Sequence, residues 1–482
     1  MVISREGMEG TPSMKSYDCI IVGAGSAGCT IARKLVHSGL NVALIDSNPK
    51  EKIGYPWEVT VERSVFGRIG LLLPPKSMWE EDPDVSRFFA EKPEDYVEVE
   101  DVNEEGFTLG HRALNQHLLD LAIESGVDLY EQHSALRLLY TNDSITGIAG
   151  DRKGLFGQQS FHMDSSLVID ATGIWAVLRR QVPDRYNIKK RLRKQDFAFG
   201  FQETREVSDA QLQRIKEEFE LLPGMSATRI GKYHAYESIH VRKNNTVNLI
   251  FGSSISGSGS PEGNPSQQFH TRYPFFGKRV SGGGRLIPLR RALDTLVGNG
   301  FLCVGDSACQ VIPTMGSGVA SSMHAADIAA RTITEAWNQG KIGFETLWAY
   351  NHKYQSKRGA ILASYDIVRR FLQSMTLNQV TEVFHAGLLS NENFISTFSS
   401  NTITYDFRQI VEKLSRVFTN LGLVSLSLRF MQAMRDSQRA MNLYKEYPEE
   451  YDMEEFHRWQ KKTDDLYENY RTFSKGEREV FL

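Results

Sequence analysis

The strongest constraint on the fold is a glycine-rich turn near the start of the chain. Gly23-Ala24-Gly25-Ser26-Ala27-Gly28 follows the short apolar run 17–22 and opens a helix-like stretch, 26–38. A second apolar run, 41–45, comes next. Short apolar runs on either side of a helix are typical of buried parallel strands. The chain is therefore expected to begin with a β-α-β unit.

Each position of this turn has a physical role if a dinucleotide is bound. Gly23 permits the tight change from strand to helix, and Gly25 lets the backbone approach a pyrophosphate without a Cβ in the way. Gly28 allows the helix to pack closely on the sheet. The helix starts at Ser26 and Ala27, where free N–H groups and the positive end of the helix dipole favour a phosphate.

Asp46 ends the second strand, about 20 residues after the turn. A carboxylate at this place accepts hydrogen bonds from the adenosine ribose. The turn, its flanking elements and Asp46 together predict a dinucleotide site. NAD and FAD satisfy this pattern equally well, so a second signal is needed to separate them.

The second signal lies far downstream. The apolar run 301–304 ends in Gly305-Asp306, and Gly316-Ser317-Gly318 opens a further helix-like stretch. This arrangement resembles the second FAD fingerprint of flavoprotein hydroxylases and isoprenoid reductases. The resemblance implies that Asp306 bonds the ribityl chain or the pyrophosphate. It also implies that the glycines and their N–H groups lie beside the isoalloxazine. The alternative roles are a helix N-cap for Asp306 and a plain loop for the glycines.

Two further pieces match the same flavoproteins. Ala171-Thr172-Gly173 ends the strand 166–170, where these proteins carry an ATG or ADG triplet. Arg112, at the start of the helix-like stretch 113–125, occupies the place of an arginine that contacts FAD in them. The alternative for Arg112 is a surface salt bridge.

The segment Gly284-Arg285-Leu286-Ile287-Pro288-Leu289 and the turns above resemble geranylgeranyl reductases, especially the archaeal type. The resemblance implies hydride transfer from reduced FAD to a C=C bond of a prenyl chain, inside an apolar tunnel. The implied fold is α/β, with a Rossmann-type FAD-binding domain interrupted by an antiparallel-sheet substrate domain. The expected parts are an extension (1–15), the FAD-binding domain (16–180 and 285–340), the substrate domain (181–284) and a helical C-terminal domain (341–482).

The strand expected to shape the prenyl pocket departs from that family. Tyr236-Glu237-Ser238-Ile239-His240-Val241 stands where the family has a YxWxFP-like strand. Tyr236 and His240 share one face of such a strand, and either can donate a proton. Tyr55, in a loop that lacks the family's Cys-Gly pair, is a third candidate catalytic residue. A structural role is the alternative for each.

Composition limits the partners. The chain has 482 residues and a formal net charge of -3, so no global positive field indicates nucleic acid. Its four cysteines form no metal-binding or disulfide pattern, and no apolar run is long enough to span a membrane. A cytoplasmic protein without a metal site is expected, with peripheral contact to a membrane left open. The basic run 189–194 is either a solvated face or a contact for a diphosphate, a membrane or an acidic donor protein.

Several alternatives stay open at this point. Flavin-dependent monooxygenases and lycopene cyclases share the implied fold, as do non-catalytic prenyl-binding proteins. The electron donor is expected to be NAD(P)H or ferredoxin, because no second complete dinucleotide fingerprint occurs. The substrate is expected to be a prenyl-chain small molecule or lipid.

Overall fold

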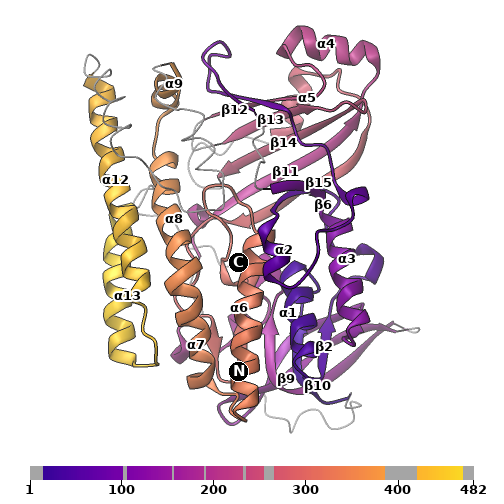
Figure 1. The fold of residues 1–482 in the computed structure, drawn as a ribbon, viewed down its shortest axis with the longest axis vertical. Helices are drawn as coiled ribbons and strands as arrows, with labels where there is room; N and C mark the ends of the chain where they lie inside the picture. The colour runs from indigo at the N-terminus through magenta and orange to yellow at the C-terminus, as the bar shows by residue number, and fades with distance from the viewer. Residues whose placement is uncertain are drawn as a thin grey trace.

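A computed structural model shows two large sheets with a layer of long helices beside them (Figure 1). It describes residues 15–100, 106–154, 157–188, 192–231, 235–254, 265–385 and 421–470. Several regions for which the sequence made predictions lie outside these ranges: the extension up to residue 14, residues 189–191 of the basic run, and part of the C-terminal region.

The first sheet has a parallel centre that holds the glycine-rich turn. Its main path runs β16-β17-β10-β1-β2-β7, and the β8-β9 hairpin continues from β10. The strand β2 is entirely apolar and buried, and in β1 every residue except Asp18 is buried, as expected for a sheet covered on both faces. Its strands are β1 (Tyr17–Val22), β2 (Val42–Ile45), β7 (Asp128–Tyr130), β8 (His133–Thr141), β9 (Ser144–Gly154), β10 (Gly157–Asp170), β16 (Val297–Gly298) and β17 (Phe301–Cys303).

Three helices pack around this sheet. The helix α1 (Ser26–His37) joins β1 to β2 and lies between α3 (His111–Glu124) and α6 (Val319–Asn338). Because β17 pairs with β10, the segment after residue 300 returns to the sheet that residues 17–45 begin. The predicted β-α-β unit and the late return to the first sheet are therefore both present.

The second sheet is largely antiparallel and runs β15-β11-β14-β13-β12-β4-β5. The helices α4 (Asp209–Phe219) and α5 (Pro265–Arg272) cover one face with a separate apolar core. Its strands are β4 (Val85–Phe89), β5 (Val97–Glu100), β11 (Phe197–Glu206), β12 (Met225–Ile230), β13 (Tyr236–Val241), β14 (Thr246–Ser254) and β15 (Arg279–Pro288).

The strands β4 and β5 belong to this second sheet, although they come from the range 16–180 that was assigned to the FAD-binding domain. Between the two large sheets lies a small one, formed by β3 (Glu58–Glu62) and β6 (Gly106–Gly110), with α2 (Ser64–Arg68) next in the chain. The domain division remains a proposal. In it, β4 and β5 leave the FAD-binding domain and join the sheet of the substrate domain.

The C-terminal part is helical, as the sequence indicates. The helix α7 (Phe344–Tyr354) continues through a π-helical turn, Gln355–Gly359, into α8 (Ala360–Gln373). Beside α8 lie α9 (Leu377–His385), α12 (Leu421–Lys445) and α13 (Met453–Glu468) (Figure 1). Of the helices in the described ranges, none combines the length and apolar composition needed to cross a bilayer.

Candidate cofactor and active site

The glycine-rich turn has the shape that a pyrophosphate requires. Gly23 has φ +107°, and a Cβ there would lie 2.2 Å from the carbonyl oxygen of Ala171. A Cβ on Gly28 would lie 1.9 Å from the Gly23 carbonyl oxygen. A Cβ on Gly25, by contrast, would meet no heavy atom within 4 Å. Gly23 and Gly28 are therefore needed for close packing, whereas Gly25 borders open space at the start of α1.

Side chains from two other elements hold this turn. The Asp46 carboxylate accepts hydrogen bonds from Ala24 N at 2.9 Å and Asn48 N at 2.8 Å. Asn115, on α3, donates to Ala24 O at 2.7 Å and accepts from the Ser26 hydroxyl at 2.9 Å. Asn115 was not picked out from the sequence, because a buried asparagine within a helical pattern carries no local signal.

The late segment meets the early turn in space. Val304 N donates to Asp170 O at 3.0 Å, and a Cβ on Gly305 would lie 3.4 Å from the Cβ of Ala27. The 171–173 turn lies alongside, since Ala171 N donates to Val22 O at 2.8 Å. Gly173 has φ +69° and faces open space. We call the turns 23–28, 171–173, 305–306 and 316–318 the cofactor cradle.

Asp306 is the charged group of the cradle that lacks a partner. Its carboxylate accepts no hydrogen bond from any described residue, and burial raises its pKa to about 6, against the opposing charge of Arg285. A Cβ on Gly318 would lie 3.1 Å from Asp306 Oδ1. A partly buried carboxylate without a donor fits a hydroxyl-bearing ligand such as the ribityl chain of FAD.

The neighbouring glycines form the end of the cradle. Gly316 has φ +71°, and a Cβ there would lie 3.6 Å from the Ile287 side chain on β15. Ser317 follows, and its carbonyl oxygen accepts from Ile312 N at 3.0 Å. The cradle therefore borders the second sheet at this point, where the reactive ring of a flavin is expected.

A stack of side chains reaches into the cradle from the other side. The Arg285 guanidinium lies over the Tyr55 ring, and the Tyr55 ring stacks on His111 with centroids 4.8 Å apart. Burial raises the pKa of Tyr55; Arg285 opposes this shift, and the charges of Asp306 and Asp46 add to it. The charges of Asp306, in the cradle, and of Asp46, beside it, therefore both act on Tyr55.

The local chain explains the position of Tyr55. Gly54 has φ +94°, and a Cβ there would lie 2.8 Å from the Cα of Arg112. Tyr55 N donates to His111 Nδ1 at 3.0 Å, and burial lowers the pKa of His111 to about 3, so this ring is a neutral acceptor. Arg112 itself is exposed, and its Nε donates to Gly54 O at 3.4 Å. The start of α3 thus fixes the loop that carries Tyr55.

Arg285 has no hydrogen bond or ion pair within the described part of the chain, and burial lowers its pKa. It was named in the sequence only as part of the Gly284–Leu289 segment. Strand register explains its place, since Arg285 pairs with Gly200, Gly200 with Gly252, and Gly252 with Tyr236. Arg285 and Tyr236 therefore share a row across four strands, with two glycines between them.

We call the side of the second sheet that carries this row the inner face, because the opposite side packs on α4 and α5. The Tyr236 ring lies across Gly252, since a Cβ on that glycine would lie 2.2 Å from Tyr236 Cε1 and 2.6 Å from Cζ. The phenol therefore points from β13 toward β11 and β15, and burial raises its pKa. Gly252 makes this orientation possible.

His240 lies on the same inner face, four residues along β13, which is about 13 Å of extended strand. It pairs in register with Ser226 and Asn248. Burial and the nearby Arg242 charge lower the pKa of His240 to about 4. Asn248 Nδ2 donates to the Glu58 carboxylate at 2.7 Å, so this end of the face is covered by β3. The structure brings Tyr55 to the cradle, places Tyr236 in the row of Arg285 three strands away, and leaves His240 at the covered end.

The fold is shared with FAD-dependent enzymes of known structure. The structure resembles a geranylgeranyl bacteriochlorophyll reductase-like protein from Thermoplasma acidophilum, with a TM-score of 0.67, 16% identity, and coverage of 84% of this chain and 96% of that one. It also resembles a halogenase solved in complex with FAD, with a TM-score of 0.56, 14% identity, and coverage of 95% and 96%. No family model matches the chain.

The chain is homologous to curated digeranylgeranylglycerophospholipid reductases. It is 27% identical to the one from Sulfolobus acidocaldarius over 447 residues, which cover 90% of this chain and 93% of the relative. It is 24% identical to the one from Methanothrix thermoacetophila, over 77% of this chain and 90% of the relative. The resemblance drawn from the sequence and the α/β fold class are thereby confirmed.

Proposed function

We propose that this protein is an FAD-dependent oxidoreductase that reduces C=C bonds of isoprenoid chains. The observation that carries the proposal is the meeting of two turns almost three hundred residues apart, beside a sheet whose inner face carries the Tyr236 phenol. Homology to phospholipid reductases supports a substrate with a long prenyl chain. When bound, reduced FAD supplies a hydride.

The residues of the cradle would hold the cofactor at both ends. Gly25 and the N–H groups at Ser26 and Ala27 would receive the pyrophosphate. Asp46 has oxygen lone pairs beyond the two backbone donors that it already accepts, and these would receive the ribose. Asp306 would accept from the ribityl chain, and this bond would satisfy a carboxylate that otherwise has no donor.

The remaining half of the reaction is delivery of a proton to the alkene. Tyr236 keeps its phenolic proton at neutral pH, because burial raises its pKa, and the ring is aimed along the inner face. Tyr55 is the second candidate, on the cradle side. His240 is a weaker one, because its lowered pKa leaves it neutral at pH 7 and it sits at the covered end of the face. We therefore assign the donor role to Tyr236 first and Tyr55 second.

The direct test is anaerobic turnover. Purified protein reconstituted with FAD and reduced chemically should be reoxidised by a geranylgeranyl phospholipid, with mass increases in steps of two hydrogens. Reoxidation in the absence of oxygen separates a reductase from a monooxygenase of the same fold, which consumes oxygen. A mass-neutral product would instead support cyclase-like chemistry. Failure to reduce any prenyl lipid would contradict the proposal.

The reductant and the location of the protein are finer parts of the proposal. NAD(P)H or a ferredoxin would reduce the flavin, and stopped-flow reduction with each donor in turn would identify which is used. A substrate of this class resides in a lipid phase, so a cytoplasmic protein with peripheral contact to a membrane is proposed.

A further inference from the structure

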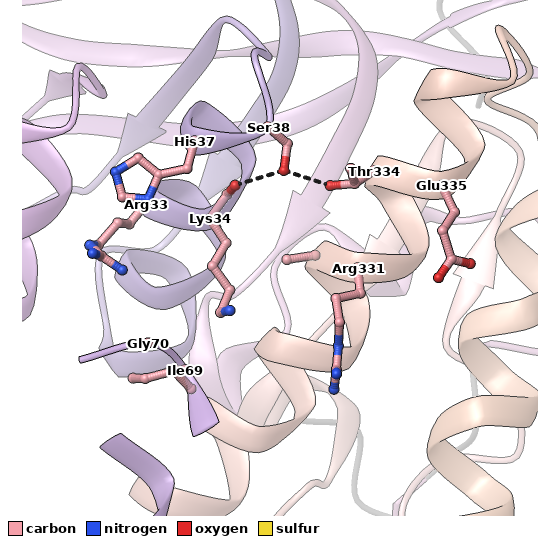
Figure 2. A pocket seen from close by; sticks show the side chains of 10 residues that line it. Arg33, Lys34, His37, Ser38, Ile69, Gly70, Arg331, Thr334 and Glu335 are labelled. Carbon is pink, nitrogen blue, oxygen red and sulfur yellow. Dashed lines mark hydrogen bonds between the residues drawn. The ribbon is translucent and has the colours of Figure 1, made fainter. Parts of the chain in front are cut away.

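A groove of about 460 Å³ lies at the far end of α1 from the cofactor cradle. Figure 2 shows that it is bounded by the last turns of α1, the chain just after α2 and the second half of α6. The pyrophosphate turn lies at the first residues of α1, whereas the groove begins at Arg33. The groove is therefore separate from the redox site.

The groove carries an excess of positive charge. Arg33 and Lys34 come from α1, and Arg331 comes from α6 (Figure 2). His37 of α1 also lines the groove, but burial and the charges of Arg33 and Lys34 lower its pKa, so it adds no charge at pH 7. Asp327 pairs with both Lys34 and Arg331, so one carboxylate faces two cations. Arg33 has no ion pair within the described ranges, and burial lowers its pKa.

The carboxylate of Glu335 does not cancel this charge, because it pairs with Lys353 on α7. A partly buried guanidinium without a counter-ion favours an anion. The groove therefore suits phosphate groups of a negatively charged partner.

An apolar loop emerges from the rim of this groove. Ile69 and Gly70 line the groove, and the loop 71–75 follows directly. Leu72 is 89% exposed, more than any other large apolar side chain in the described residues, and Leu73 is 43% exposed. Scattered exposed leucines are common, but two adjacent ones at the tip of a loop beside a basic groove form a patch.

The loop is held at both ends. Leu71 N donates to Phe66 O at 2.8 Å, and the Trp79 indole donates to Pro74 O at 3.1 Å. The leucines are therefore presented by a structured turn, and ordering them on a partner costs little further entropy. Exposed cations flank the loop on both sides, Arg68 before it and Lys76 after it.

We propose that the loop 71–75 and the adjacent groove dock this protein on an anionic phospholipid surface. Leu72 and Leu73 enter the apolar boundary of the lipid layer, while Arg33 and the flanking cations bind headgroup phosphates. This deepens the proposed function, since it rests on a substrate that resides in lipid. Charge complementarity favours lipid over a protein partner, because the apolar tip is small and the cations surround it.

Docking at this place is connected to the redox site through one strand. The helix α2 follows β3, and β3 begins at Glu58. Glu58 N donates to the Gln202 side chain at 2.6 Å, and the Glu58 carboxylate accepts from Asn248 at 2.7 Å. The docked loop is thus tied to the inner face, where a lipid chain would react.

The test is co-sedimentation of the FAD-loaded protein with vesicles. Vesicles of phosphatidylglycerol and phosphatidylcholine should bind the wild type, and vesicles of phosphatidylcholine alone should bind it at least tenfold more weakly. Leu72→Glu should lower affinity for the mixed vesicles at least tenfold, and Arg68→Glu should lower it less. Leu136→Glu is the matched control, because Leu136 is 47% exposed on β8, and it should bind as the wild type does. Raising the salt concentration should weaken binding.

Three results would overturn the proposal. The first is equal binding of the Leu72→Glu variant and the wild type to anionic vesicles. The second is a wild type that does not bind anionic vesicles. The third is a Leu72→Glu variant that loses self-association and keeps its binding to vesicles. Turnover separates the two proposals: with detergent-solubilised prenyl phospholipid, Leu72→Glu should equal the wild type, and with vesicle-embedded substrate it should be slower. If the wild type turns over neither substrate yet binds vesicles, the proposed function fails and the docking surface stands.

Discussion

The cofactor cradle and the inner face of the second sheet differ in how their residues come together. The cradle is made of short turns in which backbone shape decides function, and the turns 23–28, 171–173 and 305–306 follow the ends of β1, β10 and β17. The inner face is a row of single residues from four strands, aligned only by sheet register. Substitutions in the cradle should therefore affect folding and cofactor binding, whereas substitutions on the inner face should affect chemistry in an otherwise intact protein.

The largest effect is expected at Gly28. Its Cβ in Gly28→Ala would lie 1.9 Å from a backbone oxygen, which α1 cannot relieve without moving off the sheet. We expect a loss of about 3 kcal/mol in the free energy of unfolding, together with loss of bound FAD. Urea unfolding and the flavin absorbance of the purified variant measure both.

Gly25→Ala is the control for this prediction, because its Cβ faces open space. It should keep the apoprotein's stability and weaken only FAD binding, about tenfold, by intruding on the pyrophosphate. Equal destabilisation by the two variants would contradict the roles assigned to them.

Tyr236→Phe should leave the cradle unchanged and slow the chemistry. Loss of a positioned proton donor typically costs a factor of about 100 in rate. The measurement is single-turnover reoxidation of the reduced flavin by a prenyl lipid, with flavin content and flavin reduction unchanged. His240→Gln, on the same face but at its covered end, should change this rate by less than about twofold. If flavin reoxidation were slow in His240→Gln and close to the wild-type rate in Tyr236→Phe, the proton donor would be His240 and not Tyr236.

Arg285 connects the two regions, because it lies on the second sheet and its charge acts on the cradle. Arg285→Met should weaken binding of anionic reduced FAD relative to oxidised FAD by about tenfold, which lowers the two-electron potential by about 30 mV. Dye-equilibrated redox titration measures the shift. Arg285→Lys keeps the charge and should keep the potential close to the wild-type value. If the arginine has only a structural role, the potential should be unchanged in both variants.

The smallest effect is a pH dependence that originates at Asp306. Its pKa is about 6 in the folded apoprotein, above the value of about 3.9 expected when unfolded. The folded state therefore binds more protons between these values, so this group's contribution to stability is present below pH 4 and is lost as the pH rises through 6. Asp306→Asn should flatten the stability profile between pH 4 and 7, measured by thermal unfolding without FAD. If instead the stability of the wild type rose with pH over this range, and Asp306→Asn removed that rise, the predicted direction would be wrong.

Much of the cradle could be predicted from the sequence because its requirements are local. Gly23 and Gly305 come just after strands, so the few residues around each of them predict the turn. The bounds of the strands follow from short apolar runs. The contact between the two turns could be predicted only by resemblance, and the structure supplies it through the pairing of β17 with β10.

The inner face could be predicted only in part. Tyr236 and His240 were placed on one face by the two-residue period of a strand, but their different surroundings depend on β14 and β3, which are distant in sequence. Arg285 has no local signature, since its place on the inner face depends on the pairing of β15 with β11 at Gly200. Residues 189–191 of the basic run lie outside the described ranges, and the basic groove on α1 and α6 is formed by residues that no single run contains.

The segment from Tyr55 to Glu58 has a consequence for how the reaction geometry is maintained. Its first residue stacks within the cradle, and its last is fastened to the second sheet through Gln202 and Asn248. Four consecutive residues thus act as a spacer of fixed length between the cradle and the inner face. Lengthening or shortening this segment would alter the distance between the Tyr55 stack and the inner face, so among relatives an insertion or deletion here would be expected to shift the second sheet relative to the cradle.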